Sequence, residues 1–206
     1  MPATDGSERK QAVNKMKREL ILKAGRSVFE ASGLEGASLR AIAKAAGYTP
    51  AALYFHFTNK EEIYAALLEQ SLINLQDSVD EAVIGVTDAK QRLRAVTLAF
   101  FHFYLHSPKD LELGFYLSQG GMTPKGVGQE YNSKLNDRLV GALSPIALAA
   151  QELGASQSEA RQQMAAIFAH ATGVLLLAHT GRIRLFELSA DAMMDQYLDE
   201  LLSAYR

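Results

Sequence analysis

The sequence contains no cysteine, although it is 206 residues long. Without cysteine the chain forms neither disulfide bonds nor thiolate metal sites, and nothing in it requires an oxidising compartment. Residues 1–10 also lack the apolar stretch that a secretory signal needs. We therefore expect a cytoplasmic protein whose fold depends on packing alone.

Long hydrophobic runs are lacking as well. The nearest candidate, residues 164–180, is shorter than the roughly 20 residues that a bilayer span requires. It also contains His170 in its middle and His179 near its end, which lipid would penalise. The segment predicts a buried helix, and we expect no membrane partner.

Alternating β-branched residues, the signature of strands, are too few for a sheet, so the sequence predicts an all-α fold. Helix-ending and helix-starting signals divide its first part into short helices. Gly33 ends the first, Ser38 and Gly47 bound the second, and Thr49 with Pro50 begins the third. A long fourth helix begins at Asn59.

The net charge of −2 conceals an asymmetry along the chain. Residues 1–60 contain 10 Lys or Arg and 5 Asp or Glu, a balance of +5. Residues 61–206 contain 11 and 18, a balance of −7, and the two sum to −2. A basic first part joined to an acidic remainder indicates that the first part meets a polyanion.

Two short helices joined by a tight turn at residues 46–49 form the arrangement that places a second helix in the DNA major groove. The second, recognition helix is predicted from Pro50 to about Phe57. Short helices joined by glycine turns also occur in proteins that never bind DNA, so this pattern alone leaves the function open.

Residues 36–63, GASLRAIAKAAGYTPAALYFHFTNKEEI, resemble the DNA-binding module of the TetR-like repressors, the tetracycline-repressor family. The family pattern appears in order at Ser38, Ile42-Ala43, Ala46-Gly47, Leu53-Tyr54, His56-Phe57 and Lys60-Glu61. The resemblance covers about the first 75 residues. It implies about nine helices, a homodimer formed by the last two long helices, and a ligand cavity in the body.

The expected fold is therefore an N-terminal three-helix helix-turn-helix module followed by a six-helix ligand-binding and dimerisation body. Residues 1–60 form the basic arm and the DNA-binding domain, and residues 61–206 form the body. The resemblance, with the chemistry of each side chain, predicts a set of DNA-binding residues: Arg40, Thr49, Pro50, Ala51, Ala52, Tyr54, His56 and Lys60.

These residues have different predicted roles. Tyr54 and His56 offer hydroxyl and imidazole donors to phosphate oxygens, and Arg40 reaches the backbone or a guanine edge. Ala51 and Ala52 replace residues that often donate hydrogen bonds in the family, so we expect few direct base contacts and more dependence on DNA shape or water.

Lys60 supplies a separate argument for phosphate binding. A cation in the first turn of a helix opposes the helix dipole, at a cost of about 0.3–1 kcal/mol. A phosphate docked at that helix end would explain its position, whereas the alternative is an exposed lysine whose stem covers apolar surface. For the basic residues before and within the first helix, we leave open a DNA-binding arm and a solvated tail: Arg9, Lys10, Lys15, Lys17, Arg18 and Lys23.

The body contains a cluster of aromatic residues between positions 100 and 116. Such a cluster is typical of a core and also of an apolar ligand pocket. The residues predicted to line a pocket are Phe101, His102, Tyr104, Tyr116 and His170. His102 and His106 have metal-ligand spacing but lack the glutamate of the hydrolytic zinc motif, so we expect no metal and no cofactor.

Small residues on the penultimate helix and a broad apolar face on the last one favour a four-helix bundle across a twofold axis, although packing within one chain is the alternative. The sequence thus predicts a homodimeric transcriptional regulator. The preferred form is a repressor that a small apolar or aromatic ligand releases from a palindromic operator. An enzyme is disfavoured because no catalytic set is present, and control by a partner protein stays open.

Overall fold

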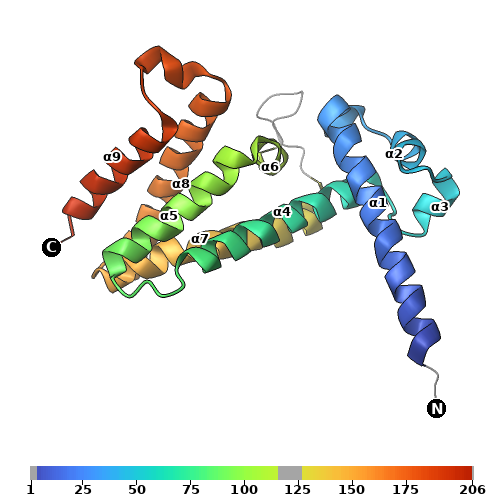
Figure 1. Cartoon of the computed structure of the whole chain (residues 1–206), viewed down its shortest axis with the longest axis horizontal. Helices are drawn as coiled ribbons and strands as arrows, with labels where there is room; N and C mark the ends of the chain where they lie inside the picture. Colours follow the sequence, from blue (N-terminus) through green and yellow to red (C-terminus); the bar gives the residue numbers. More distant parts are fainter. Residues whose placement is uncertain (1–3, 116–126, 206) are drawn as a thin grey trace. The chain divides into compact units, whose positions relative to one another are not determined.

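The computed structural model describes residues 4–115 and 127–205, and every regular element in these ranges is a helix (Figure 1). The predicted all-α fold is confirmed. In chain order the helices are α1 (Thr4–Gly36), α2 (Leu39–Ala46), α3 (Pro50–Tyr54), α4 (Lys60–Ala82), α5 (Ala89–His106), α6 (Pro108–Gly114), α7 (Gln129–Glu152), α8 (Gln157–His179), the 3-10 helix η1 (Arg182–Phe186) and α9 (Ala190–Ser203). None of the helices in these ranges is both long and apolar enough to cross a bilayer.

The described residues form two compact units. The N-terminal unit comprises residues 4–70 with 112–115 and 127–135, and the body unit comprises residues 71–111 and 136–205. This division falls within α4, whereas the sequence placed the boundary before it, at residue 60.

The core of the N-terminal unit brings α1, α2 and α4 together. Ile21 of α1, Ile42 of α2 and Ile63 of α4 are fully buried. Gly25 permits the close approach, because a Cβ there would lie 2.7 Å from Cγ2 of Ile63. Apolar residues at three- and four-residue spacing predict this face of α1, but Leu20, which the same spacing includes, is 49% exposed.

Local capping determines where the short helices begin and end. The Ser38 hydroxyl accepts from the Ala41 N–H and the Thr49 hydroxyl from the Ala52 N–H, both at 3.2 Å. Gly47 ends α2 with φ 73° and ψ 24°, a left-handed conformation that suits glycine. The predicted caps of the helix-turn-helix are thus present. The predicted recognition helix was too long, since α3 ends at Tyr54 and the chain then tightens into a turn.

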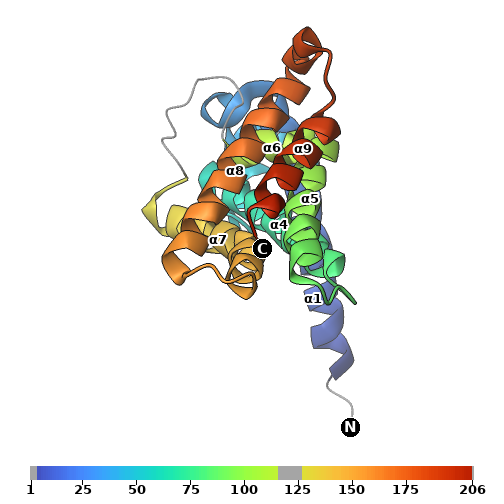
Figure 2. The same cartoon turned by 90° about the vertical axis from the view of Figure 1, so that its left-hand side faces the viewer.

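The core of the body unit is centred on α5. Its buried residues are Leu93, Val96, Thr97, Phe100, Phe101 and Tyr104. Phe100 meets Phe168 of α8 edge-on, with ring centroids 5.8 Å apart. In Figure 2, α5, α8 and α9 lie beside one another, and both α8 and α9 contact α5. A capping box formed by Ser156 and Glu159 begins α8.

Pro145 lies inside α7 without ending it. Proline has no N–H, so the carbonyl of Gly141, four residues earlier, loses its helical donor. The Ser144 hydroxyl donates to that carbonyl at 2.7 Å instead. The hydroxyl thus replaces the missing N–H donor, and α7 continues to Glu152.

Candidate nucleic-acid interface

The helix-turn-helix consists of α2, the turn at residues 47–49 and α3. Ile42 and Leu53 are buried beneath it, so the opposite faces of both helices are turned to solvent. Nearly all of the residues predicted to contact DNA are on α2, on α3 or in the turn between and after them.

The outer face of α2 is cationic. Arg40 and Lys44 are both exposed and lie four residues apart, hence on one side of the helix. Arg40 was predicted as a DNA-binding residue, whereas Lys44 was missed. Its four-residue spacing from Arg40 could have identified Lys44 from the sequence. The pair presents two flexible cations that suit phosphate oxygens or a guanine edge.

The C-terminal end of α3 exposes two aromatic residues. Tyr54 is 58% exposed and Phe55 is 90% exposed, while Leu53 and Phe57 on either side are buried. Phe55 was missed, although the burial of its neighbours implies that it faces outward. A tyrosine hydroxyl can donate to phosphate, and an exposed phenylalanine offers apolar contact to sugars or thymine methyls.

The N-terminal end of α3 carries small side chains. Thr49, Pro50 and Ala51 are exposed and Ala52 is half-buried. Thr49 uses its hydroxyl oxygen as the helix cap but retains its O–H donor. His56 is half-buried, and its carbonyl accepts from Nη1 of Arg18 at 3.2 Å. Arg18 also lies over the Phe57 ring at 4.1 Å and so ties α1 to the turn after α3.

The side chain of Lys60 binds backbone carbonyl groups, whereas the sequence-based hypothesis placed a DNA phosphate beside it. Its ammonium donates to the carbonyls of Leu34 (2.8 Å), Glu35 (3.1 Å) and Ala37 (3.2 Å). An ammonium has three N–H donors, so these carbonyls can engage all of them. A cation is favourable at the carbonyl end of a helix, and Lys60 therefore matches the end of α1 although it opposes the dipole of α4. A docked phosphate is not needed to explain its position.

Exchanging Lys60 for methionine tests this role. Lys60→Met keeps the apolar stem and removes the donors, so we expect a loss of about 1–2 kcal/mol in the free energy of unfolding. Urea denaturation followed by circular dichroism measures it. Lys44→Met, at an exposed cation, is the matched control and should change stability little. Unchanged stability in Lys60→Met together with weaker DNA binding would instead support the phosphate contact.

The basic residues of the arm lie on a helix. Arg9, Lys10 and Lys15 are exposed along α1, which extends from Thr4. A helix presents these cations at fixed spacing, whereas a solvated tail would not. The DNA-binding arm and the inert extension both stay possible roles for this helix.

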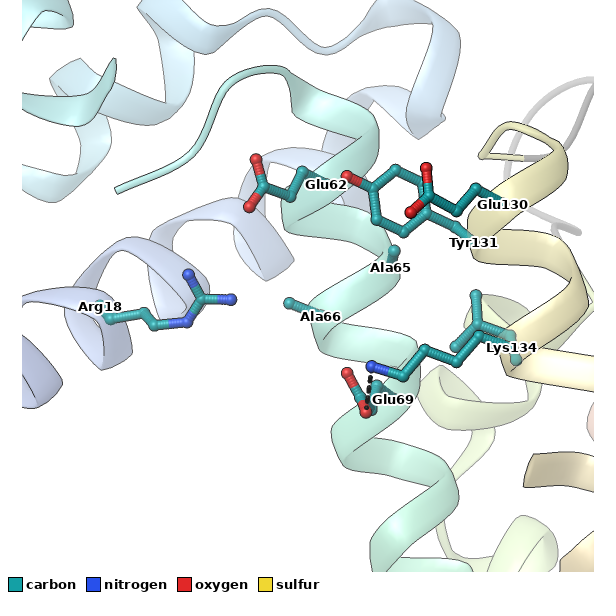
Figure 3. A pocket seen from close by; sticks show the side chains of 9 residues that line it. Arg18, Glu62, Ala65, Ala66, Glu69, Glu130, Tyr131 and Lys134 are labelled. Carbon is teal, nitrogen blue, oxygen red and sulfur yellow. Dashed lines mark ion pairs between the residues drawn. The ribbon is translucent and has the colours of Figure 1, made fainter. Parts of the chain in front are cut away.

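A hollow of about 300 Å³ lies in the N-terminal unit between α1, α4 and the beginning of α7 (Figure 3). Its lining is charged: Arg18 points toward it from α1, and Lys134 pairs with Glu69 at 3.0 Å across it. Glu62 also lines it while accepting from the N–H and hydroxyl of Thr58. Such a lining does not suit an apolar ligand.

The structure separates the residues predicted to form a ligand pocket. Phe101 and Tyr104 are buried in the core of the body unit, and burial, with a smaller effect of Asp110, raises the pKa of Tyr104 well above its usual value. His102 is half-exposed, with Nε2 2.9 Å from a carboxylate oxygen of Asp191 on α9. Tyr116 lies outside the described residues.

His170 lies on α8 and contacts α9. Its ring stacks on Tyr197 of α9, with centroids 3.9 Å apart and planes 10° from parallel. Burial lowers the pKa of His170, against an opposing effect of Glu200. His170 thus joins α8 to α9. Within residues 4–115 and 127–205, no group of three or more potential metal ligands comes together.

Comparison with known proteins gives consistent results. Residues 21–67 match the model of the bacterial regulatory proteins of the tetR family. The HTH-type transcriptional activator FasR of Mycolicibacterium smegmatis is 38% identical over 99 residues, which are 48% of this chain and 45% of FasR. The uncharacterized HTH-type transcriptional regulator TtgW of Pseudomonas putida is 30% identical over 125 residues, which are 60% of this chain and 88% of TtgW.

The first curated relatives match over only part of their length. The matched stretches are 45% of FasR and 54% of the regulator UidR of Escherichia coli, so the chain spans about half of each. Among solved structures, FadR of Bacillus subtilis in complex with stearoyl-CoA has a TM-score of 0.68 at 20% identity, covering 91% of this chain and 99% of FadR. At that identity the likeness is one of fold.

Proposed function

The chain belongs to the tetR family of bacterial regulatory proteins, and we propose that it is a homodimeric repressor that a small ligand releases from a palindromic DNA operator. The observation that carries the proposal is the exposed face of the helix-turn-helix within the matched residues. There, Arg40 and Lys44 of α2 lie beside a short recognition helix whose Tyr54 faces solvent.

Charge and shape support DNA as the partner. The outer face offers cations for phosphates and small or apolar groups for close approach to the groove. Few of these groups can read a base edge bidentately, so specificity depends mainly on Arg40, on water and on DNA shape. A helix-turn-helix of this kind reads two half-sites as a dimer, which implies a twofold-symmetric operator.

The second copy is expected on the exposed face of α8. A dimer places two recognition helices at a separation that the body determines. A ligand that favours one arrangement of the body would change that separation, and moving the population from 1:99 to 99:1 requires a roughly 10⁴-fold difference in affinity between the states.

The ligand is expected to be largely apolar. The buried interior around α5 is aromatic, with Phe100, Phe101 and Tyr104 all nearly inaccessible. FadR of Bacillus subtilis, which has the same fold, was solved with stearoyl-CoA, a molecule with a long apolar chain. Activation of transcription is the alternative to repression, because FasR is by name an activator.

Fluorescence anisotropy with labelled duplex DNA from upstream of the chain's own gene tests the proposal. We expect binding that weakens with salt, the logarithm of the binding constant falling by about 0.9 per neutralised phosphate for each unit of log salt concentration. A scrambled duplex of equal length is the control. Equal affinity for both duplexes, or no binding at low ionic strength, would contradict the proposed function.

A further inference from the structure

Three buried hydroxyl groups of the body unit have no hydrogen-bond partner, those of Ser71, Thr97 and Thr172, and of these three residues Thr172 is only partly buried. Ser71 of α4 and Thr97 of α5 are each 0% exposed, and neither Oγ of Ser71 nor Oγ1 of Thr97 is hydrogen-bonded. The other buried side chains of residues 7–115 and 127–205 are hydrophobic, and of these only Tyr64 and Tyr104 carry a hydroxyl. The interior of the body unit thus contains polar groups that the chain itself leaves unused.

Two other hydroxyls, one on a helix and one at a helix end, donate to a backbone carbonyl. Ser78, two turns after Ser71 on the same helix, donates to the carbonyl of Asn74 at 3.0 Å, and Thr180 donates to that of Leu176 at 2.6 Å. Donation to the carbonyl four residues earlier is the usual arrangement for serine and threonine in helices. The hydroxyls of Ser71 and Thr97 do not make this bond, although both side chains are inaccessible to water.

An unused hydroxyl in an apolar interior is unfavourable, because folding removes its bonds to water and replaces them with none. Valine has nearly the same shape as threonine and alanine fits the space of serine, and neither would carry this penalty. A polar atom supplied from outside the chain removes the penalty, and a bound ligand can supply it.

The surroundings determine which polar atom fits. The charged residues of α5 point to the surface, where Arg92 bonds Glu152 and Arg94 bonds Asp195 and Asp199. On α5, the buried residues nearest to Thr97 in the sequence are Val96, Phe100 and Phe101. An ionised head group would find no counter-charge there and would stay in water.

We propose that the hydroxyls of Ser71 and Thr97 bind the head of the effector, an uncharged hydroxyl or carbonyl group carried on an apolar chain. The inference rests on the proposed function, in which an effector enters the body. The apolar part would pack against the aromatic side chains of α5 and α8, and any ionised part of the molecule would remain outside the interior.

The test compares three ten-carbon probes, 1-decanol, decanoate and decane, at pH 8, where decanoate is ionised. Binding to the full chain is followed by the shift of the thermal midpoint in circular dichroism. We expect 1-decanol to raise the midpoint clearly more than decanoate or decane at equal concentration. An equal response to decane and 1-decanol, or no response to 1-decanol, would overturn the inference.

Substitutions then locate the head group. Thr97→Val and Ser71→Ala should each weaken 1-decanol binding about tenfold, while Ser78→Ala, whose hydroxyl is already bonded, should leave it unchanged. Without a probe, the midpoint of Thr97→Val should equal or exceed that of the original chain. A marked loss of stability in Thr97→Val would show that the hydroxyl binds only a buried water, and would overturn the inference.

The same samples are measured with the operator duplex. Absence of operator binding by the unsubstituted chain without any probe would contradict the proposed function. Retained DNA binding with unchanged 1-decanol affinity in Thr97→Val would overturn only the assignment of the head group.

Discussion

Gly173→Leu is expected to convert the protein into monomers and to weaken operator binding by about 10²–10⁴-fold, the gain that joining two binding modules typically provides. Gly173 lies on the exposed side of α8, and a Cβ there would meet nothing within 4 Å. The chain itself therefore has room for a side chain, and a glycine inside a helix costs about 1 kcal/mol relative to alanine. In the proposed dimer, close approach of a second helix would account for the glycine at this position.

Other residues on α8 extend this surface. Ala165 and Ala169 are exposed and repeat at four-residue spacing with Gly173, and Leu176 is 45% exposed at the next turn. Small residues along one face let two helices pack closely, and a twofold dimer applies the same face on both copies. A leucine at position 173 would hold the two copies apart.

The direction of the change in the free energy of unfolding distinguishes loss of the dimer from misfolding. Because the substitution relieves a helical glycine, the monomer should be as stable as the original chain or slightly more so. Gly141→Leu is the matched control, since Gly141 of α7 also has no neighbour within 4 Å of a Cβ. Light scattering after size exclusion gives the oligomeric state. A monomer produced by Gly141→Leu and not by Gly173→Leu would place the interface on α7.

Sequence reasoning succeeded where a structure is encoded within a few residues. The caps Ser38 and Thr49 and the left-handed Gly47 all occur as predicted, because each depends on a side chain and an N–H only three residues away, or on glycine's freedom at one position. The order of helices follows from these signals together with apolar periodicity.

Contacts between distant residues were not predictable in this way. The bonds of Lys60 join residues 23 to 26 positions apart, and the contact of His102 with Asp191 joins residues 89 positions apart. Neither capping nor periodicity carries information on such pairs, so Lys60 and His102 were assigned to a phosphate and to a pocket. The stacking of His170 on Tyr197 escaped prediction for the same reason.

Burial of some residues also determines which neighbouring side chains of the helix-turn-helix are exposed to solvent. A pattern that buries Leu53 and Phe57 leaves Tyr54 and Phe55 exposed, yet the resemblance drew attention to Tyr54 alone. Lys44 was overlooked although it shares a face of α2 with Arg40. Lys44 and Phe55 both extend the exposed surface that Arg40 and Tyr54 form on the helix-turn-helix.

Arg40→Ala is expected to weaken operator binding by about 10²–10⁴-fold in the dimer. A hydrogen bond to a charged group contributes about 1.5–3 kcal/mol, and a twofold complex loses it at both half-sites. Arg40 is exposed on α2, so its removal should leave the free energy of unfolding nearly unchanged. Fluorescence anisotropy with the operator duplex measures the affinity, and urea denaturation checks the fold.

The salt dependence then distinguishes what Arg40 contacts. If it neutralises one phosphate in each half-site, Arg40→Ala should reduce the salt slope by about 1.8, because each phosphate contributes about 0.9. If it reads a guanine edge, the slope should change less and discrimination between operator and scrambled duplex should fall. Arg184→Ala, at an exposed cation of η1 in the body unit, is the matched control and should bind DNA normally. Equal losses in both variants would mean that charge alone attracts the duplex, and the exposed face of α2 would then have no specific role.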